Sequence, residues 1–163
     1  MRIGFGYDVH RLAEGCKLNL GGLVIPHEKG SVGHSDADVL IHAIIDALLG
    51  ATNLRDIGFQ YPDSDIKYKD IDSKELLKDT LGKIIAKGYE IENIDSTICL
   101  QTPKIGQYIP QMQSLLADIL KIATNQISIK ATTTERMGFI GTGEGIAAYA
   151  IVLLRLHEEQ KKD

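Results

Sequence analysis

Hydrophobic and polar positions alternate in some stretches of the chain and recur at helical spacing in others, a pattern that predicts a mixture of strands and helices. Near the start, the alternation places Tyr7 and Val9 on one strand face and Asp8 and His10 on the other. Glycine and proline mark the ends of most stretches. We expect strands at residues 2–11, 17–20, 23–25, 95–101, 126–133 and 145–156, helices at residues 35–49 (N-cap Ser35 or Asp36), 73–87 and 110–121, and loops at residues 28–34 and 53–65.

Two pairs of glycines indicate special backbone geometry. Gly21-Gly22 separates two short apolar runs, as in a two-residue hairpin turn. Gly4 and Gly6 lie within the first strand, where missing side chains allow a ligand or another backbone to approach closely.

The helix at residues 35–49 is apolar at almost every position after Val39, which is typical of a buried helix. Its exceptions are Asp38, His42 and Asp46, which follow one another at intervals of four and form a polar stripe. Polar groups buried without partners cost several kcal/mol. We therefore expect a metal ion to satisfy this stripe, with Asp46 orienting the ring of His42.

Asp8, His10 and His42 together offer one carboxylate and two imidazoles. Three protein ligands with one open position are typical of a catalytic zinc site. The same set also describes the facial triad of a mononuclear iron(II) oxygenase. A structural zinc in a non-enzymatic trimer is a third interpretation, and it requires a fourth protein ligand. A buried histidine with ordinary hydrogen-bond partners is the simplest alternative.

The last strand, residues 145–156, is apolar on both faces, whereas a strand with one face in water alternates. We expect helices to cover one of its faces and a partner subunit the other. The order of elements predicts an α+β fold, with a single mixed or antiparallel sheet and helices packed on one face. The length suits one domain over residues 1–163.

Composition narrows the functional classes. A formal net charge of −4 with scattered lysines provides no basic surface for nucleic acid. Cys16 and Cys99 stand alone, so neither a disulfide framework nor a cysteine zinc site is expected. No signal-peptide pattern opens the chain and no apolar run reaches membrane-spanning length, so we expect a cytoplasmic protein without a membrane partner.

A second stretch with chemical potential runs from Lys130 to Gly145. Three consecutive threonines at a strand end offer hydroxyl and backbone N–H donors suited to phosphate. Glu135 follows them and offers an oxygen ligand for Mg²⁺. The glycine-rich turn after it allows close backbone approach. By itself, this stretch is a weak indication of a phosphate site.

Several motifs recur together in one order: Asp8-Val9-His10, His34-Ser35-Asp36-Ala37-Asp38, His42, Asp46-Ala47-Leu48-Leu49-Gly50, Asp56-Ile57-Gly58, Pro62-Asp63, Pro103-Lys104, Lys130 through Glu135, and Gly143-Glu144-Gly145. In them the chain resembles the 2-C-methyl-D-erythritol 2,4-cyclodiphosphate synthase family of the non-mevalonate isoprenoid pathway. The resemblance extends from Arg2 to about Leu154.

The resemblance implies a phosphorus–oxygen lyase that is a homotrimer with active sites between subunits. Its substrate would be 4-diphosphocytidyl-2-C-methyl-D-erythritol 2-phosphate, which closes to a cyclic diphosphate and releases CMP. Zn²⁺ would bind Asp8, His10 and His42, and Mg²⁺ or Mn²⁺ would bind Glu135. His34 and Thr133 would stabilise the transition state. Substrate would contact Ser35, Asp56, Ile57, Gly58, Tyr61, Pro62, Asp63, Ser64, Asp65, Leu100, Gln101, Thr102, Pro103, Lys104, Ile105, Gly106, Ala131, Thr132, Thr134, Phe139 and Thr142.

One position departs from the family pattern. Thr142 stands where some members carry an arginine that reaches a substrate phosphate, so that contact is not expected here.

Overall fold

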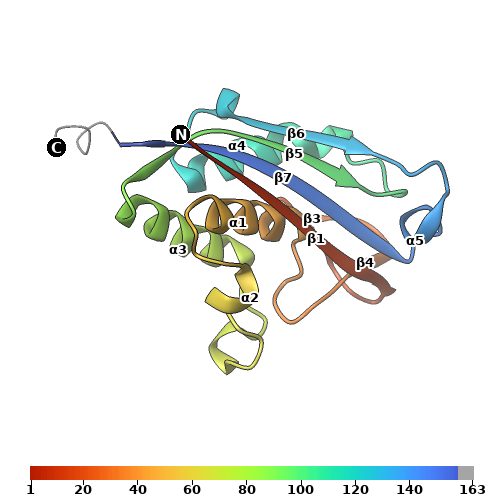
Figure 1. Cartoon of the computed structure of the whole chain (residues 1–163). Coiled ribbons are helices and arrows are strands. Elements are labelled where there is room, and N and C mark those ends of the chain that lie inside the picture. Colours follow the sequence, from red (N-terminus) through yellow and green to blue (C-terminus); the bar gives the residue numbers. More distant parts are fainter. Residues whose placement is uncertain (158–163) are drawn as a thin grey trace.

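A five-stranded mixed sheet forms the centre of the structure, a computed structural model that describes residues 1–157 (Figure 1). The strand order is β4-β1-β7-β5-β6; β5 and β6 are parallel and the other neighbours are antiparallel. This confirms the expected mixed sheet and α+β class. The strands are β1 (Arg2–Glu14), β4 (Lys29–Val32), β5 (Tyr89–Cys99), β6 (Ile127–Thr132) and β7 (Gly145–Leu156), and the hairpin expected around Gly21-Gly22 pairs β2 (Leu18–Leu20) with β3 (Leu23–Ile25).

Three longer helices lie on one face of the sheet, as predicted: α1 (Val39–Ala51), α3 (Ser73–Ala86) and α4 (Ile109–Leu120) (Figure 1). Their apolar sides and the facing side of the sheet form one large core. Short helical segments complete the chain: α2 (Ile57–Gln60), α5 (Gly138–Gly141) and the 3₁₀ turns η1 (Ile66–Tyr68), η2 (Gly106–Tyr108) and η3 (Thr124–Gln126). No helix in the described part of the chain is both long and apolar enough to span a membrane.

Helix α1 packs against β1 with its backbone, at the two glycines that the sequence singles out. A methyl group on Gly4 would overlap the carbonyl oxygen of Ala47, and one on Gly6 would overlap that of Ala43. The absence of side chains lets α1 lie directly on the strand. Because Asp8 and His10 follow on β1, this packing also fixes their distance from α1.

Gly6→Ala is therefore expected to lower the free energy of unfolding by about 3 kcal/mol, because the helix backbone must move away from the strand. Thermal and urea unfolding measure the change. Gly82→Ala is the matched control, since Gly82 lies within α3 and an added methyl there meets no atom within 4 Å. That substitution should stabilise the protein by about 0.5–1 kcal/mol. Equal effects of the two substitutions would contradict the close packing.

The structure corrects several local predictions. The strand expected at residues 95–101 is β5, which begins six residues earlier, at Tyr89, and ends at Cys99. The N-cap of α1 is Asp38, not Ser35 or Asp36, because the Asp38 side chain accepts a hydrogen bond from the N–H of Ile41. Residues 29–32, predicted as loop, form β4, whose four residues are too few to show alternation and which pairs with the end of β1. The segment 53–65 is not wholly irregular, because Asp56 caps the single turn of α2.

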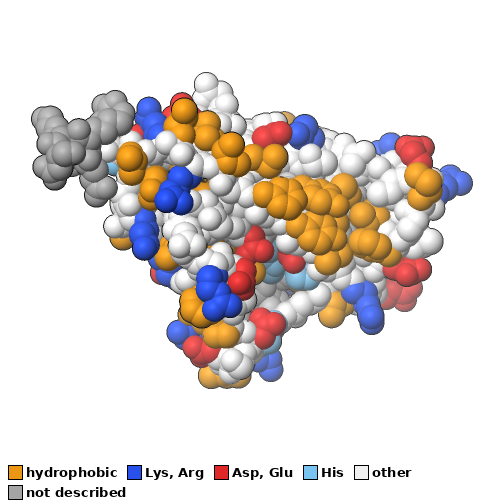
Figure 2. Space-filling view, viewed as in Figure 1, with side chains coloured by type: hydrophobic (Ala, Val, Ile, Leu, Met, Phe, Trp, Pro, Cys, Tyr) orange, Lys and Arg blue, Asp and Glu red, His pale blue; other side chains and the backbone are white. Residues whose placement is uncertain are grey.

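The face of the sheet opposite the helices carries exposed apolar side chains, which gather in one patch in the space-filling view (Figure 2). Phe5 and Ile151 are direct neighbours across β1 and β7, as are Tyr7 and Tyr149. The rings of Tyr7 and Tyr149 lie 5.0 Å apart. We call this surface the bare face; it comprises Ile3, Phe5, Tyr7, Val9, Tyr149 and Ile151, each at least 40% exposed. From the sequence we expect a partner subunit on the face of β7 that the helices leave open, and that expectation stays a prediction.

Candidate metal centre

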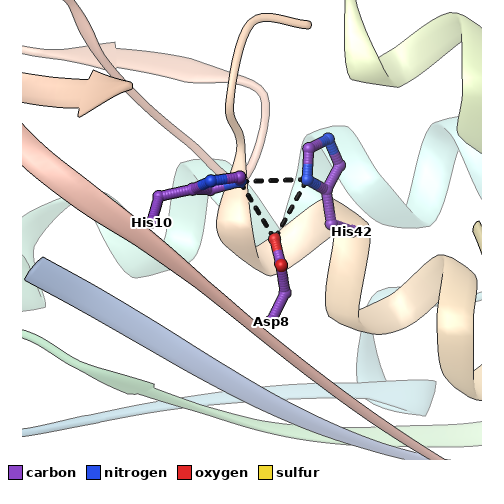
Figure 3. Close-up of side chains that lie close together, drawn as sticks. All are labelled: Asp8, His10 and His42. Carbon is purple, nitrogen blue, oxygen red and sulfur yellow. Dashed lines mark hydrogen bonds and ion pairs between the residues drawn. The ribbon is translucent and has the colours of Figure 1, made fainter. Parts of the chain in front are cut away.

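Asp8 and His10 on β1 and His42 on α1 converge on one point (Figure 3). The carboxylate oxygen Oδ2 of Asp8 lies 3.0 Å from Nε2 of His10 and 3.0 Å from Nδ1 of His42. The two imidazole nitrogens are 3.1 Å apart. Within residues 1–157, this is the one group of three or more candidate ligands close enough to share a metal ion.

The three atoms fit a metal ion. Zinc bonds to histidine nitrogen and carboxylate oxygen are about 2.0–2.1 Å long, which puts neighbouring ligands of a tetrahedral site roughly 3.3 Å apart. The observed triangle is only a few tenths of an ångström smaller. Its donors are a carboxylate oxygen and two imidazole nitrogens, which suit zinc and several other divalent transition metals.

The electrostatics of the triangle are those of a cation site. Burial raises the pKa of Asp8, but the hydrogen bonds with His10 and His42 have the larger combined effect and lower the pKa to about 2. Burial lowers the pKa of His42, and the hydrogen bond and charge of Asp8 outweigh this and raise it. Asp8 is thus ionised, and its charge favours a proton on Nδ1 of His42, the nitrogen that faces it. A bound metal ion would replace that proton.

The other two members of the polar stripe on α1 have partners of their own. Asp38 is fully buried and accepts hydrogen bonds from the N–H groups of Gly21 and Gly22, at 3.0 and 2.7 Å. Asp46 accepts from the N–H of Ile57 at 2.7 Å, and among the described residues its carboxylate forms no hydrogen bond with the ring of His42. Backbone donors from the hairpin and from α2 therefore satisfy the buried Asp38 and the partly buried Asp46. Helical spacing does not reveal this pairing between distant segments.

A cavity of about 330 Å³ opens beside the three ligands. Six further residues that the sequence analysis names line it: His34, Ser35, Ile57, Gly58, Tyr61 and Asp63. Asp56 lies outside the lining and caps α2, the helix that carries Ile57 and Gly58. Nδ1 of His34 lies 3.7 Å from the carboxylate of Asp63, so the loop bearing Asp63 reaches back over the cavity. We call this space the metal-side cavity.

A second cavity, of about 240 Å³, lies at the ends of β5 and β6. Eight predicted substrate contacts and the predicted transition-state residue Thr133 form its lining: Leu100, Gln101, Pro103, Lys104, Ile105, Gly106, Ala131, Thr132 and Thr133. The hydroxyl of Thr133 donates to the carboxylate of Glu135 at 3.1 Å. Glu135 thus belongs with this cavity, which we call the strand-end cavity. The two cavities share no lining residue.

The remaining predicted contact residues lie outside both linings. Pro62, Ser64 and Asp65 belong to the loop around the metal-side cavity, and Thr102 precedes Pro103 at the strand-end cavity. The hydroxyl of Thr134 donates to the carbonyl of Met137, and that of Thr142 to the carbonyls of Gly138 and Phe139. Phe139 lines a third cavity beside Tyr7 and Val9.

Sequence reasoning missed five residues around the metal-side cavity. Gly33, Tyr68, Ile71 and Leu76 complete its lining. Ser73 lies behind it, with its hydroxyl oxygen 2.8 Å from Nε2 of His42. The sequence shows Ser73 as an ordinary helix start, and no local spacing links it to a histidine 31 residues earlier.

Comparison with known proteins identifies the family to which this arrangement belongs. A sequence model of the YgbB family matches residues 1–155. The chain belongs to the YgbB family. A YgbB-family relative in Bacteroides fragilis, named 2-C-methyl-D-erythritol 2,4-cyclodiphosphate synthase, is 60% identical over 154 residues, which are 94% of this chain and 97% of the relative. The resemblance seen in the sequence is thereby confirmed.

Solved structures agree with the assignment to the YgbB family. The bifunctional IspDF of Campylobacter jejuni superposes with a TM-score of 0.91 at 44% identity, over 95% of this chain and 42% of that chain. The Plasmodium falciparum protein IspF, solved as a CDP complex, superposes with a TM-score of 0.84 at 34% identity, over 96% of each chain.

Proposed function

We propose that the chain converts 4-diphosphocytidyl-2-C-methyl-D-erythritol 2-phosphate to 2-C-methyl-D-erythritol 2,4-cyclodiphosphate and CMP. An oxygen of the 2-phosphate attacks the β-phosphorus of the diphosphate and forms a new P–O–P bridge. The bond from the β-phosphorus to the oxygen that bridges it to the α-phosphorus breaks, and that oxygen leaves with CMP. The observation that carries the proposal is the open cavity beside Asp8, His10 and His42 in a chain 60% identical to a named synthase.

The substrate has a nucleotide end and a methylerythritol end, and the chain has two separate cavities to receive them. The strand-end cavity offers Lys104 and threonine donors for cytidine phosphates. The metal-side cavity takes the methylerythritol phosphate part. The bare face supports assembly into a homotrimer, in which the strand-end cavity of one subunit meets the metal-side cavity of the next. The CDP complex of the P. falciparum protein supports a nucleotide ligand.

Asp8, His10 and His42 would hold Zn²⁺, and Glu135 with substrate phosphates would hold Mg²⁺ or Mn²⁺. When bound, these ions supply Lewis acidity and neutralise charge on the phosphates. Glu135 fits this role because Mg²⁺ is commonly held by one or two carboxylates together with substrate phosphates.

The chain's own residues then position the two reacting phosphate groups and neutralise their negative charge. The attacking phosphate is already anionic, so the reaction needs no general base. Its requirement is to hold two groups of like charge in line. Lys104 provides a fixed positive charge in one cavity, and Thr133 provides a hydroxyl donor there. His34 borders the other cavity, where it can donate to a phosphoryl oxygen as charge develops.

Turnover of the synthetic substrate tests the proposal. We expect the purified chain with zinc and Mg²⁺ to produce one CMP and one cyclic diphosphate per substrate molecule. Phosphorus NMR measures both products. Removing metal with a chelator should stop the reaction, and added zinc with Mg²⁺ or Mn²⁺ should restore it. Iron with oxygen-dependent turnover would favour the oxygenase interpretation instead. A metal bound by a fourth protein side chain, without CMP release, would favour a structural zinc.

A further inference from the structure

We propose that Ser73, held in place by Asp36, is a positioning residue that keeps a proton on Nε2 of His42 and so leaves Nδ1 free to bind the metal. The inference rests on the proposed zinc centre and adds to it two residues that belong to neither the ligand set nor the substrate contacts. Ser73 is fully buried, and its hydroxyl oxygen lies 2.8 Å from Nε2 of His42. Nδ1 is the nitrogen that faces Asp8 and His10.

The direction of the Ser73–His42 hydrogen bond follows from the surroundings of Asp36. The Asp36 carboxylate accepts from the hydroxyl of Ser73 and, at 3.1 Å, from the N–H of Ser73. It also accepts from the N–H of Asp38 at 3.2 Å. An ionised carboxylate can only accept, and a serine hydroxyl has one hydrogen to donate. Since Asp36 takes that hydrogen, the Ser73 oxygen can only accept from His42.

A proton on Nε2 has a direct consequence for metal binding. A neutral imidazole carries its hydrogen on one nitrogen and a lone pair on the other. Fixing the hydrogen on Nε2 places the lone pair on Nδ1, where it points at the centre of the ligand triangle. Ligating histidines generally donate their second ring N–H to a partner that fixes the tautomer, and loss of that partner weakens metal binding about 10–100-fold.

Ser35 is a second neighbour of the same nitrogen, and its position differs. Its hydroxyl oxygen is 3.1 Å from Nε2 of His42 and accepts from the N–H of Ala37 at 3.3 Å. Ser35 lines the metal-side cavity, where substrate can compete for its hydroxyl. Ser73 lies behind the ring with no access to the cavity lining. The permanent partner of Nε2 is therefore Ser73.

Ser73 can be changed without removing a helix cap. It is the first residue of α3, but the N-cap is Asp72, whose side chain accepts from the N–H of Lys74 at 2.9 Å. Ser96 provides a matched control: it is 2% exposed, and its hydroxyl donates to the carbonyl of Ser128 at 2.9 Å, within the sheet. Both alanine substitutions remove one buried, hydrogen-bonded serine hydroxyl.

The first test compares zinc affinities of the full chain by competition with a chromophoric chelator. Ser73→Ala should raise the zinc dissociation constant about 10–100-fold relative to wild type, and Ser96→Ala should leave it unchanged. A dissociation constant for Ser73→Ala within about twofold of wild type would overturn the proposal, since zinc binding by the wild type shows the centre itself to be present.

The second test needs no variant. Nitrogen-15 spectra of the His42 ring in the zinc-loaded protein report which nitrogen carries the hydrogen. We expect zinc on Nδ1 and a hydrogen on Nε2, because Asp8 and His10 face Nδ1 and the Ser73 oxygen faces Nε2. An Nε2 without a hydrogen in the zinc-loaded protein would overturn the proposal. A wild-type chain that takes up no zinc would remove the proposed centre itself, whereas a zinc-binding chain without a hydrogen on Nε2 would remove only the role of Ser73.

Discussion

His42→Ala is expected to abolish stoichiometric zinc binding and to lower kcat at least about 10³-fold. A metal ion supplies several kcal/mol of charge stabilisation in the transition state, and each 1.36 kcal/mol corresponds to a factor of ten in rate. Of the three ligands, His42 is the one supplied by α1, so its loss leaves only the two ligands of β1. Zinc content by atomic emission and CMP release under saturating substrate measure the two effects.

His157→Ala is the control for His42→Ala. His157 is exposed and follows the end of β7 remote from the metal centre, because that centre lies near the pairing of His10 with Ile146. Its substitution should change neither zinc content nor rate. Circular dichroism and the melting temperature establish that the His42 variant is folded. A folded, zinc-free His42→Ala protein with full activity would contradict the proposed function.

Tyr149→Lys is expected to convert the proposed trimer to monomers and to lower activity about 10²-fold or more. Tyr149 lies at the middle of the bare face, next to Phe5 and Tyr7. A charge placed there loses hydration whenever a second subunit covers the patch. In the proposed trimer the two cavities of one site come from different subunits, so activity should fall with loss of assembly; misplacing a reacting group by even about 1 Å costs about 10²-fold.

Analytical ultracentrifugation measures the assembly. The chain has a mass of 17.9 kDa, so the wild type should sediment as three chains and Tyr149→Lys as one. Zinc binding should persist in the variant, because all three ligands belong to one chain. Val24→Lys is the matched control: Val24 is a 62% exposed apolar residue on β3, outside the bare face. An unchanged trimer in Tyr149→Lys would show that the bare face is not the interface.

Much of this architecture is predictable from sequence where local patterns are strong. The last strand, residues 145–156, is found with the expected bounds because its apolar run is continuous and a glycine begins it. Helix α1 is recognisable as buried from its composition. The meeting of Asp8, His10 and His42 is predictable for two reasons. Strand periodicity puts Asp8 and His10 on the same face, and His42 is a polar residue on an otherwise apolar, buried helix and so needs a polar partner.

Other features depend on contacts between distant segments. Asp38 caps α1 and also binds the turn at Gly21-Gly22, so its burial has a structural cause that the stripe on α1 does not reveal. Likewise, Nε2 of His42 lies within hydrogen-bond distance of Ser73 on α3 and of Ser35, whereas the carboxylate of the nearby Asp46 pairs with the N–H of Ile57. Short edge strands such as β4 acquire their structure from pairing and lack a periodic signal of their own.

The most direct test of the zinc centre is a crystal structure of the zinc-loaded chain with CDP, using anomalous scattering at the zinc absorption edge. The account predicts one strong peak per chain, about 2.0–2.1 Å from Oδ2 of Asp8, Nε2 of His10 and Nδ1 of His42, with a phosphate oxygen as fourth ligand. A peak elsewhere, or a fourth ligand from a protein side chain, would contradict it.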